Sequence, residues 1–385
     1  MKFKNKAGIY ALIAFVLAAC TGNKSTETTS VGSADIIKIG EVGSMTGSEA
    51  TFGSSTHNGI ALAVDQINAA GGINGKKIQL ITMDDQGKPE EASTAVTKLV
   101  TQDKVVAILG EVSSSRSMAM APVSQQYKVP MISPSSTNPR VTEMGDYIFR
   151  VCFIDPFQGT VMARFALETL KVKSVAVLRD VKNDYSVGLA DFFTKTFTAG
   201  GGKIVIDQSY SAGDIDFKSQ LTSIKGKNPE AIFVPGYYTD VGLIARQAKE
   251  LKIPVPLLGG DGWDSPKLYE IGGESINGSY FSNHYSAEDT SPMIQDFIAK
   301  YKAKYKEVPD GLAAMGYDAM KVLENAMKTA KSFDGKDLRD AIAATKNYQA
   351  VTGTITLDEK RNPKKAAVVL KVDGTNFKYS ATIQP

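Results

Sequence analysis

The segment from Val105 to Arg140 reads VVAILGEVSSSRSMAMAPVSQQYKVPMISPSSTNPR and alternates apolar strands with hydroxyl-rich turns. An apolar strand at 105–109 leads into the turn SSS at 113–115, and a helix follows it. A second strand at 129–132 leads into the turn SST at 135–137. Two parallel strands that are joined by a helix end at the same edge of their sheet. Open α/β sheets bind ligands at that edge, so the two turns are the first candidates for a site.

These two turns together resemble a small polar cup. Each one leads towards a helix start, where unpaired backbone N–H groups and the helix dipole favour an anion such as a carboxylate. Ser and Thr also cap helices without any ligand, and either turn alone fits that structural role. Two similar turns at consecutive strand ends favour a binding site.

The residues before this segment extend the same pattern towards the N-terminus. Strands are expected at Ile36–Gly43 and Ile78–Met83, and helices at Asn58–Ala70 and Pro89–Thr101. Because the strands are largely apolar, they predict a parallel sheet that is covered by helices on both faces.

A second α/β lobe is predicted from Phe149–Pro156 onwards, where the alternation of helices and strands restarts. Three helices beyond Met293 need a sheet to cover, and we assign them to the first lobe. The strand-rich tail beyond Gly353 is expected to complete both sheets. A chain of 385 residues is long enough for two such domains.

The N-terminus predicts export and a lipid anchor. A basic start with three lysines precedes the apolar stretch Ala7–Ala19, which is too short to span a bilayer. The sequence LAAC at Leu17–Cys20 resembles a bacterial lipoprotein cleavage box. That resemblance implies a signal peptide at 1–19 and lipid on Cys20; an ordinary signal peptide is the alternative. Residues 20–35 are small and polar, which predicts a flexible tether.

The charge balance argues against nucleic acid as a partner. Removing residues 1–19 lowers Lys+Arg from 44 to 41, against 41 Asp+Glu, so the mature chain is formally neutral. Of the 2 cysteines only Cys152 then remains as a thiol, which excludes an internal disulfide. Cys152 lies in an apolar run and is expected to be buried.

The sequence gives little support for an enzymatic function. It contains no G-x-S-x-G elbow, no P-loop, no G-x-G-x-x-G and no Cys/His metal spacing. Its 2 histidines, His57 and His284, are not placed as an obvious general base. We therefore expect no catalysis, no metal and no cofactor.

Five segments in order resemble the extracytoplasmic solute-binding proteins of branched-chain amino acid ABC importers, the leucine/isoleucine/valine-binding type. They are IKIGEVGSMTG at 37–47, INAAGGINGKKIQLITMDD at 67–85, the two hydroxyl-rich turns, RDVKNDYSVGLADFF at 179–193 and FVPGYYTDVGLIARQAKELKIPVPLLGGDGW at 233–263. The resemblance implies an α/β type I periplasmic-binding-protein fold, in which two Rossmann-like lobes are joined by three hinge crossovers. The implied boundaries are 36–155 plus 286–362 for lobe one, and 156–285 plus 363–385 for lobe two.

The same resemblance implies roles for residues of the cup. Ser114 would hold the ligand carboxylate, Thr137 would touch carboxylate and ammonium, and the carbonyl of Ser135 would accept from the ammonium. Ser135 stands where the family usually has Ala, which is harmless if only its backbone is used. Ser113 and Gly87 occupy positions that form a disulfide in the best-known members, and both cysteines are lost together here.

Opposite the cup, the resemblance implies that Tyr185 and Tyr237 close over the ligand and that Asp261 neutralises its ammonium. Close relatives have Glu where this chain has Asp261, which is one methylene shorter. A turn or a cap for the following helix is the structural alternative for Asp261. Phe52 and Trp263 are candidate walls of an apolar side-chain pocket, with core packing as their alternative.

The implied function is the capture of an amino acid, branched-chain or otherwise apolar, and its delivery to an ABC permease and ATPase. The alternatives are the same fold binding an amide, an aromatic acid or another small polar solute, and a ligand sensor. Asp261 discriminates between them, because a ligand without an amine gains nothing from a buried carboxylate. We expect an extracytoplasmic monomer that touches the membrane only through its lipid.

Overall fold

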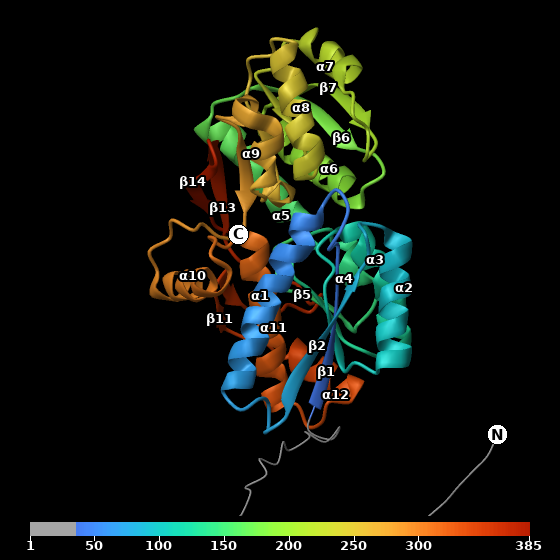
Figure 1. Ribbon diagram of the computed structural model, residues 1–385. Helices are drawn as coiled ribbons and strands as arrows, with labels where there is room; N and C mark the ends of the chain where they lie inside the picture. The colour runs from blue at the N-terminus through green and yellow to red at the C-terminus, as the bar shows by residue number, and fades with distance from the viewer. Residues whose placement is uncertain (1–35) are drawn as a thin grey trace, which may run out of the picture.

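The computed structural model describes residues 36–385, which form two α/β lobes, one above the other in Figure 1. The predicted signal peptide at 1–19, the lipidation site Cys20 and the tether at 20–35 lie outside the described residues. Between residues 36 and 385, no helix combines the length and the apolar character that a membrane span requires.

The first lobe is built on a sheet of five parallel strands in the order β2-β1-β3-β4-β5. Its strands are Ile36–Gly43 (β1), Lys77–Asp84 (β2), Ala107–Leu109 (β3), Met131–Ser133 (β4) and Ile148–Arg150 (β5). Its helices are Ala50–Ala69 (α1), Pro89–Lys98 (α2, continued by a π-helical turn at Leu99–Asp103), Ser114–Tyr127 (α3), Arg140–Glu143 (α4), Pro292–Tyr305 (α10), Gly311–Thr329 (α11) and Gly335–Ala343 (α12).

Helices cover both faces of this sheet, which confirms the architecture predicted from its apolar strands. One face packs against α1, α11 and α12, with Ile39, Ile60 and Leu323 in the shared core. The other face packs against α2 and α3, with Val96 and Met120 in its core. The late helices α11 and α12 therefore return to the first sheet, as the sequence predicts.

Helix α1 begins at Ala50, earlier than the expected start at Asn58. Its first turns do not lie over the sheet. They reach the second lobe, where Phe52 packs edge-on against Tyr237 and Tyr238. Because these turns are buried by the other lobe, the apolar spacing that marks the rest of the helix is missing from them.

The second lobe contains a sheet of seven strands in the order β14-β13-β10-β9-β8-β6-β7. Its strands are Ser174–Asp180 (β6), Lys203–Tyr210 (β7), Ala231–Phe233 (β8), Leu257–Gly259 (β9), Tyr280–Asn283 (β10), Ala367–Asp373 (β13) and Asn376–Ile383 (β14). Strands β6 to β10 pair in parallel, whereas β13 and β14 are antiparallel.

Helices also cover both faces of the second sheet. They are Asp155–Arg164 (α5, continued by a π-helical turn at Phe165–Thr169), Asp184–Ala199 (α6), Lys218–Lys225 (α7), Tyr238–Glu250 (α8) and Lys267–Gly272 (α9), with 3-10 turns at Asp261–Trp263 (η4) and Gly273–Ile276 (η5). Phe193 and Phe197 of α6 fill the core on one face, and Leu221 and Ile244 of α7 and α8 fill the other.

The chain passes between the lobes three times: after β5, after β10 and before β13. The hairpin Tyr348–Ala350 (β11) and Gly353–Ile355 (β12) joins neither sheet, so the expectation that the tail completes both sheets was wrong. The hairpin is held instead by α11, because the Asp318 carboxylate accepts from the N–H groups of Val351 and Thr352 at 2.8 Å each.

Candidate functional site

The two hydroxyl-rich turns of lobe one lie side by side. Ser114 is the first residue of α3, and its hydroxyl accepts from the backbone N–H of Asn138 at 3.2 Å. The hydroxyls of Ser117 and Ser136 are 2.7 Å apart. Because these contacts tie the start of α3 to the loop after β4, the two turns form one polar surface at the carboxyl edge of the sheet.

Thr137 has a buried hydroxyl in this surface. Its side chain is 1% exposed, and its Oγ1 has no hydrogen-bond partner among residues 36–385. Its carbonyl is occupied, since it accepts from the N–H of Asp155 at 2.9 Å. Buried hydroxyls in folded proteins are usually paired, and the group beside this one is the buried carboxyl of Asp155, whose pKa the Thr137 hydroxyl lowers.

Aromatic rings of lobe two face the polar surface. Tyr185, in the first turn of α6, stacks on Tyr237 with ring centroids 5.4 Å apart and planes 7° apart. The Tyr185 hydroxyl accepts from the N–H of Gly262 at 3.2 Å. From lobe one, Phe52 meets Tyr237 edge-on at 5.4 Å. These rings form an apolar wall beside the two turns.

A cavity of about 20 Å³ lies where the two walls meet, lined by Phe52, Val112, Ser135, Tyr185, Tyr237, Asp261, Gly262 and Leu312. That volume holds about one water molecule, so the lobes are closed on each other. Trp263 lies behind the wall and not on it. Its indole N–H donates to the carbonyl of Val234 at 3.0 Å, and it packs beside Phe281 in the core of lobe two.

Hydrogen bonds across the interface hold this closed arrangement. The Tyr237 hydroxyl donates to the Ser113 hydroxyl at 2.8 Å, and the Asn138 amide donates to the carbonyl of Asp184 at 2.9 Å. The Thr239 hydroxyl donates to the carbonyl of Ser48 at 2.7 Å. All three bonds join lobe one to lobe two, and each would break if the lobes separated.

Asp261 begins the 3-10 turn after β9 and is 5% exposed. Its Oδ2 lies 3.0 Å from Nε2 of His284 and 3.4 Å from the hydroxyl of Ser135. It does not cap the following helix: the hydroxyl of Ser265 accepts from the N–H of Lys267 at 3.1 Å. The carboxylate therefore faces the polar turns of lobe one.

A second carboxyl group lies behind the site. Asp155 is fully buried at the start of α5, and burial raises its pKa to about 7, with a further contribution from the charge of Asp261. The thiol of Cys152 is buried, as expected, and burial raises its pKa to about 12. The thiol is therefore protonated at neutral pH and unreactive.

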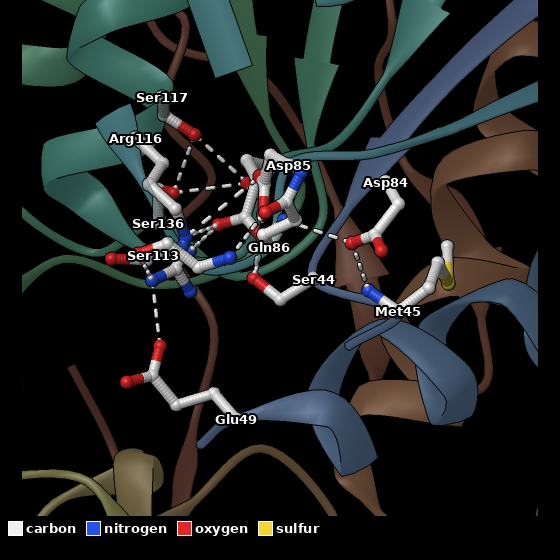
Figure 2. Close-up of polar contacts among 12 residues, drawn as sticks. Ser44, Met45, Glu49, Asp84, Asp85, Gln86, Ser113, Arg116, Ser117 and Ser136 are labelled. Atoms are coloured by element: carbon white, nitrogen blue, oxygen red, sulfur yellow. Dashed lines mark hydrogen bonds and ion pairs between the residues drawn. The ribbon is translucent and has the colours of Figure 1, made fainter. Parts of the chain in front are cut away.

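A cluster of ion pairs around Arg116 adjoins the cup (Figure 2). Nη1 of Arg116 lies 2.6 Å from Glu49, and its Nε lies 3.0 Å from Glu111 and 3.9 Å from Asp85. Burial raises the pKa of Glu111 to about 7 and raises that of Asp85 as well. Arg116 thus holds three carboxyl groups from three segments of lobe one.

This cluster occupies the place where the resemblance implies a lost disulfide. Nη1 of Arg116 donates to the carbonyl of Gly87 at 3.3 Å, and the N–H of Gly87 donates to the Asp85 carboxylate at 2.9 Å. The loop after β2 is therefore tied to α3 by hydrogen bonds and ion pairs.

Larger cavities lie elsewhere, and none of the predicted site residues lines the two described next. One of about 410 Å³ lies between the lobes beside Tyr285 and Phe377, and one of about 580 Å³ lies beside Pro254 and Tyr280. Among residues 36–385 no group of three or more His, Cys, Asp or Glu side chains is arranged to hold a metal ion.

Sequence reasoning did not identify several residues of the site. Val112 and Leu312 line the cavity, but neither stands out among the many apolar residues of the chain. Leu312 comes from α11, far along the chain from the two turns. His284 is one of the 2 histidines of the chain, but the sequence does not indicate its contact with Asp261, which only the folded structure brings about.

Comparison with known proteins shows that the chain is similar to binding proteins. A family profile described as "Periplasmic binding protein" matches residues 36–376. The Leucine-, isoleucine-, valine-, threonine-, and alanine-binding protein of Pseudomonas aeruginosa is 32% identical over 333 residues, which cover 86% of this chain and 88% of that protein.

Two solved structures are similar over nearly their whole length. A leucine-binding protein of Thermotoga maritima MSB8 is 40% identical with a TM-score of 0.87, covering 91% of this chain and 99% of that one. A branched-chain amino acid transporter substrate-binding protein of Streptococcus pneumoniae, in complex with isoleucine, is 36% identical with a TM-score of 0.86. That match covers 91% of this chain and 100% of the other.

Proposed function

Since this chain belongs to the periplasmic binding protein family, we propose that it captures an apolar α-amino acid between its lobes and delivers it to an ABC importer. The family's role is binding, not catalysis. One observation carries the proposal: a cup of hydroxyl and N–H groups on one lobe faces a buried carboxylate on the other, with an aromatic wall beside them.

The two ends of a zwitterion suit the two ends of this cleft. A carboxylate needs donors, and the start of α3 with the hydroxyls of Ser114 and Thr137 supplies them. An ammonium group needs a negative partner when it is buried, because an unpaired buried ion is costly. Asp261 and the carbonyl of Ser135 are the proposed partners of the ammonium.

The side chain of the ligand would lie against apolar groups. Phe52, Val112 and Leu312 come from lobe one and Tyr237 comes from lobe two. Aliphatic and aromatic walls favour a branched or otherwise apolar side chain. The relatives named for leucine, isoleucine and valine support this class of ligand. Trp263 lies in the core, so this proposal gives it no direct ligand contact.

Ligand entry requires the lobes to separate. We propose that residues 36–155 plus 286–362 move against residues 156–285 plus 363–385, with hinges where the chain passes between the sheets. Both walls of the cleft come from one chain, which supports a monomer as the binding unit. The partners would be a permease and its ATPase, which receive the ligand when the lobes open.

We also propose that Cys20 is lipidated and tethers the protein to the membrane, facing outwards. The motif at Leu17–Cys20 and the polar segment after it support this. Detergent partitioning of the wild type and Cys20→Ala tests it. The wild type is expected in the detergent phase and the variant in the aqueous phase. Equal release of both proteins into the aqueous phase would rule out the anchor.

Thermal-shift screening of the mature protein tests the function itself. The panel is the twenty amino acids, their amides and aromatic acids. A bound ligand stabilises by RT ln(1 + [L]/Kd), about 2.7 kcal/mol at a hundredfold excess over Kd. We expect the largest shifts from leucine, isoleucine or valine. A shift from an aromatic acid, with none from any amino acid, would support the alternative ligand class instead.

A further inference from the structure

His284 contacts Asp261, the proposed ammonium receptor, through its imidazole ring. It follows β10 directly, where the chain leaves lobe two for lobe one, and its side chain is fully buried. Its Nε2 lies 3.0 Å from Oδ2 of Asp261. Nothing in the sequence spacing connects the two residues, which are 23 positions apart.

The imidazole ring is held in a fixed orientation. It stacks on Phe153 with ring centroids 3.8 Å apart and planes 20° apart. Its backbone N–H donates to the side chain of its neighbour Asn283 at 2.7 Å. The opposite ring nitrogen, Nδ1, has no hydrogen-bond partner among the residues that the structure describes. The contact with Asp261 is therefore the polar contact that fixes the ring.

The ring is a neutral donor at physiological pH. Burial lowers the pKa of His284 to about 4, and the nearby ammonium of Lys365 lowers it further, although Asp261 acts in the opposite direction. An ionised carboxylate has acceptors only, so Nε2 carries the proton and Nδ1 carries none. His284 therefore donates to the carboxylate through Nε2 and places no positive charge beside it.

This charge state matters for ligand selection. A lysine or arginine at position 284 would neutralise Asp261 and remove its need for a cationic ligand. A neutral donor instead fixes the carboxylate through Oδ2 and leaves Oδ1 for the ligand. Orientation matters because aspartate is a short side chain, and the contact of Oδ2 with Ser135 at 3.4 Å is long for a hydrogen bond.

We propose that His284 is a positioning residue that orients the Asp261 carboxylate as a neutral hydrogen-bond donor, so that the cleft selects ligands with a free ammonium group. This inference rests on the proposed capture of an amino acid. His284 does not itself touch the ligand: it acts through Asp261, and it joins the ammonium receptor to the crossover between the lobes.

Three variants test this role by calorimetry with L-leucine and 4-methylpentanoate, which is leucine without its amine. His284→Leu keeps a side chain of similar volume but removes the hydrogen-bond donor, and His284→Gln keeps a neutral donor. The control is His57→Gln, which changes the other histidine; His57 lies on α1 and pairs with Glu41. We expect about tenfold weaker leucine binding for His284→Leu, as for the loss of one hydrogen bond to a charged group. His284→Gln should recover most of it, and His57→Gln should match the wild type.

The analogue separates positioning from packing. If His284 acts on Asp261, His284→Leu weakens the binding of leucine and leaves that of 4-methylpentanoate unchanged or stronger. Equal losses for both compounds, or leucine binding within about twofold of wild type, would overturn the role.

A measurement without ligand keeps this test independent of the proposed function. In His57→Gln, His284 is the single histidine left of 2, so its ¹⁵N resonances are unambiguous. At pH 7 we expect the His284 ring of His57→Gln to be neutral and protonated at Nε2. When Asp261→Ala is added to this variant, we expect a changed tautomer or faster exchange of the ring proton. An Nδ1–H tautomer, or no response to Asp261→Ala, contradicts positioning. If the wild type binds no amino acid while the ¹⁵N spectrum still shows the Nε2–H tautomer, the proposed function is refuted and the contact between His284 and Asp261 is retained.

Discussion

At the scale of single residues, Arg116 is the cation that pairs with two buried carboxyl groups, Glu111 and Asp85, and with the partly exposed Glu49 beside the cup. Its side chain is 4% exposed, and it contacts Glu49, Glu111 and Asp85. Removing one member of such a group leaves uncompensated charge in a low-dielectric site. The ion pairs of Arg116 therefore stabilise the segments beside the two turns.

Arg116→Gln is predicted to destabilise the fold by about 3–5 kcal/mol, because Glu111 loses its main counter-charge. Urea unfolding measures this, and adding Glu111→Gln should recover part of the loss. Arg140→Gln is the matched control: its pair with Asp184 is largely exposed, and exposed pairs contribute at most about 1 kcal/mol. Equal effects of Arg116→Gln and Arg140→Gln would contradict the role of the cluster.

The sequence predicted site residues where local pattern determines position. Ser114, Ser135 and Thr137 follow strands, so their place at a sheet edge could be expected. Trp263 and His284 also come after strands, β9 and β10. Whether they face the cleft or the core depends on packing against segments that are distant in sequence, and periodicity carries no information on that.

At the scale of elements, the close crossing of α1 and α11 requires glycine on each helix. A Cβ on Gly59 would lie 1.9 Å from the carbonyl oxygen of Ala313, and one on Gly316 would lie 2.4 Å from the carbonyl oxygen of Thr56. These contacts are with backbone and cannot be relieved by a side-chain rotation. The two helices together cover one face of the first sheet and carry Phe52 and Leu312 to the cavity.

Gly59→Ala is predicted to cost about 1–3 kcal/mol or more through overpacking. Gly226→Ala is the control, because a Cβ there meets nothing closer than 3.5 Å. It should be neutral or slightly stabilising, since alanine restricts the unfolded chain. Thermal melting of both variants checks this, and a loss at Gly226 as large as that at Gly59 would contradict it.

Element boundaries were predictable only where an element covers its own sheet. The apolar spacing of α1 marks its middle, but its first turns are buried by the other lobe and were missed. The strand at Gly353–Ile355 was expected to complete a sheet because it belongs to a strand-rich tail, but it pairs with Tyr348–Ala350 in a separate hairpin. It is held by Asp318 of α11, and a contact between distant segments leaves no pattern in the sequence.

At the scale of the whole molecule, five carboxyl groups that are buried or half-buried have pKa values raised to about 6 or 7 by desolvation. The values are about 7 for Glu111, Asp155, Asp240 and Asp264 and about 6 for Asp310. The native state therefore binds more protons than the unfolded chain between about pH 4 and pH 7. His284, with its pKa lowered to about 4, acts in the opposite direction but is one group against five.

The free energy of unfolding is consequently predicted to fall as the pH rises from about 5 to about 7.5. Melting temperatures across this range measure it, and Glu111→Gln should flatten the slope. A melting temperature that rises steadily from pH 5 to pH 7.5 would contradict the prediction.

Closure of the lobes is predicted to follow ligand binding, as in hinged binding proteins generally. The bonds from Tyr237 to Ser113 and from Asn138 to Asp184 form only when the lobes meet. Small-angle scattering should show a smaller radius of gyration with saturating L-leucine than without ligand. Identical values in the two conditions would mean that the lobes do not move.

The capture of a zwitterion between the cup and Asp261 is tested most directly by calorimetric titration of L-leucine into the mature wild type and Asp261→Ala. The wild type is predicted to bind. The variant should keep the fold and its melting temperature but bind more weakly by about 3–5 kcal/mol, on the order of a hundredfold or more. An affinity within about threefold of the wild type, at an unchanged melting temperature, would show that Asp261 does not receive the ammonium group.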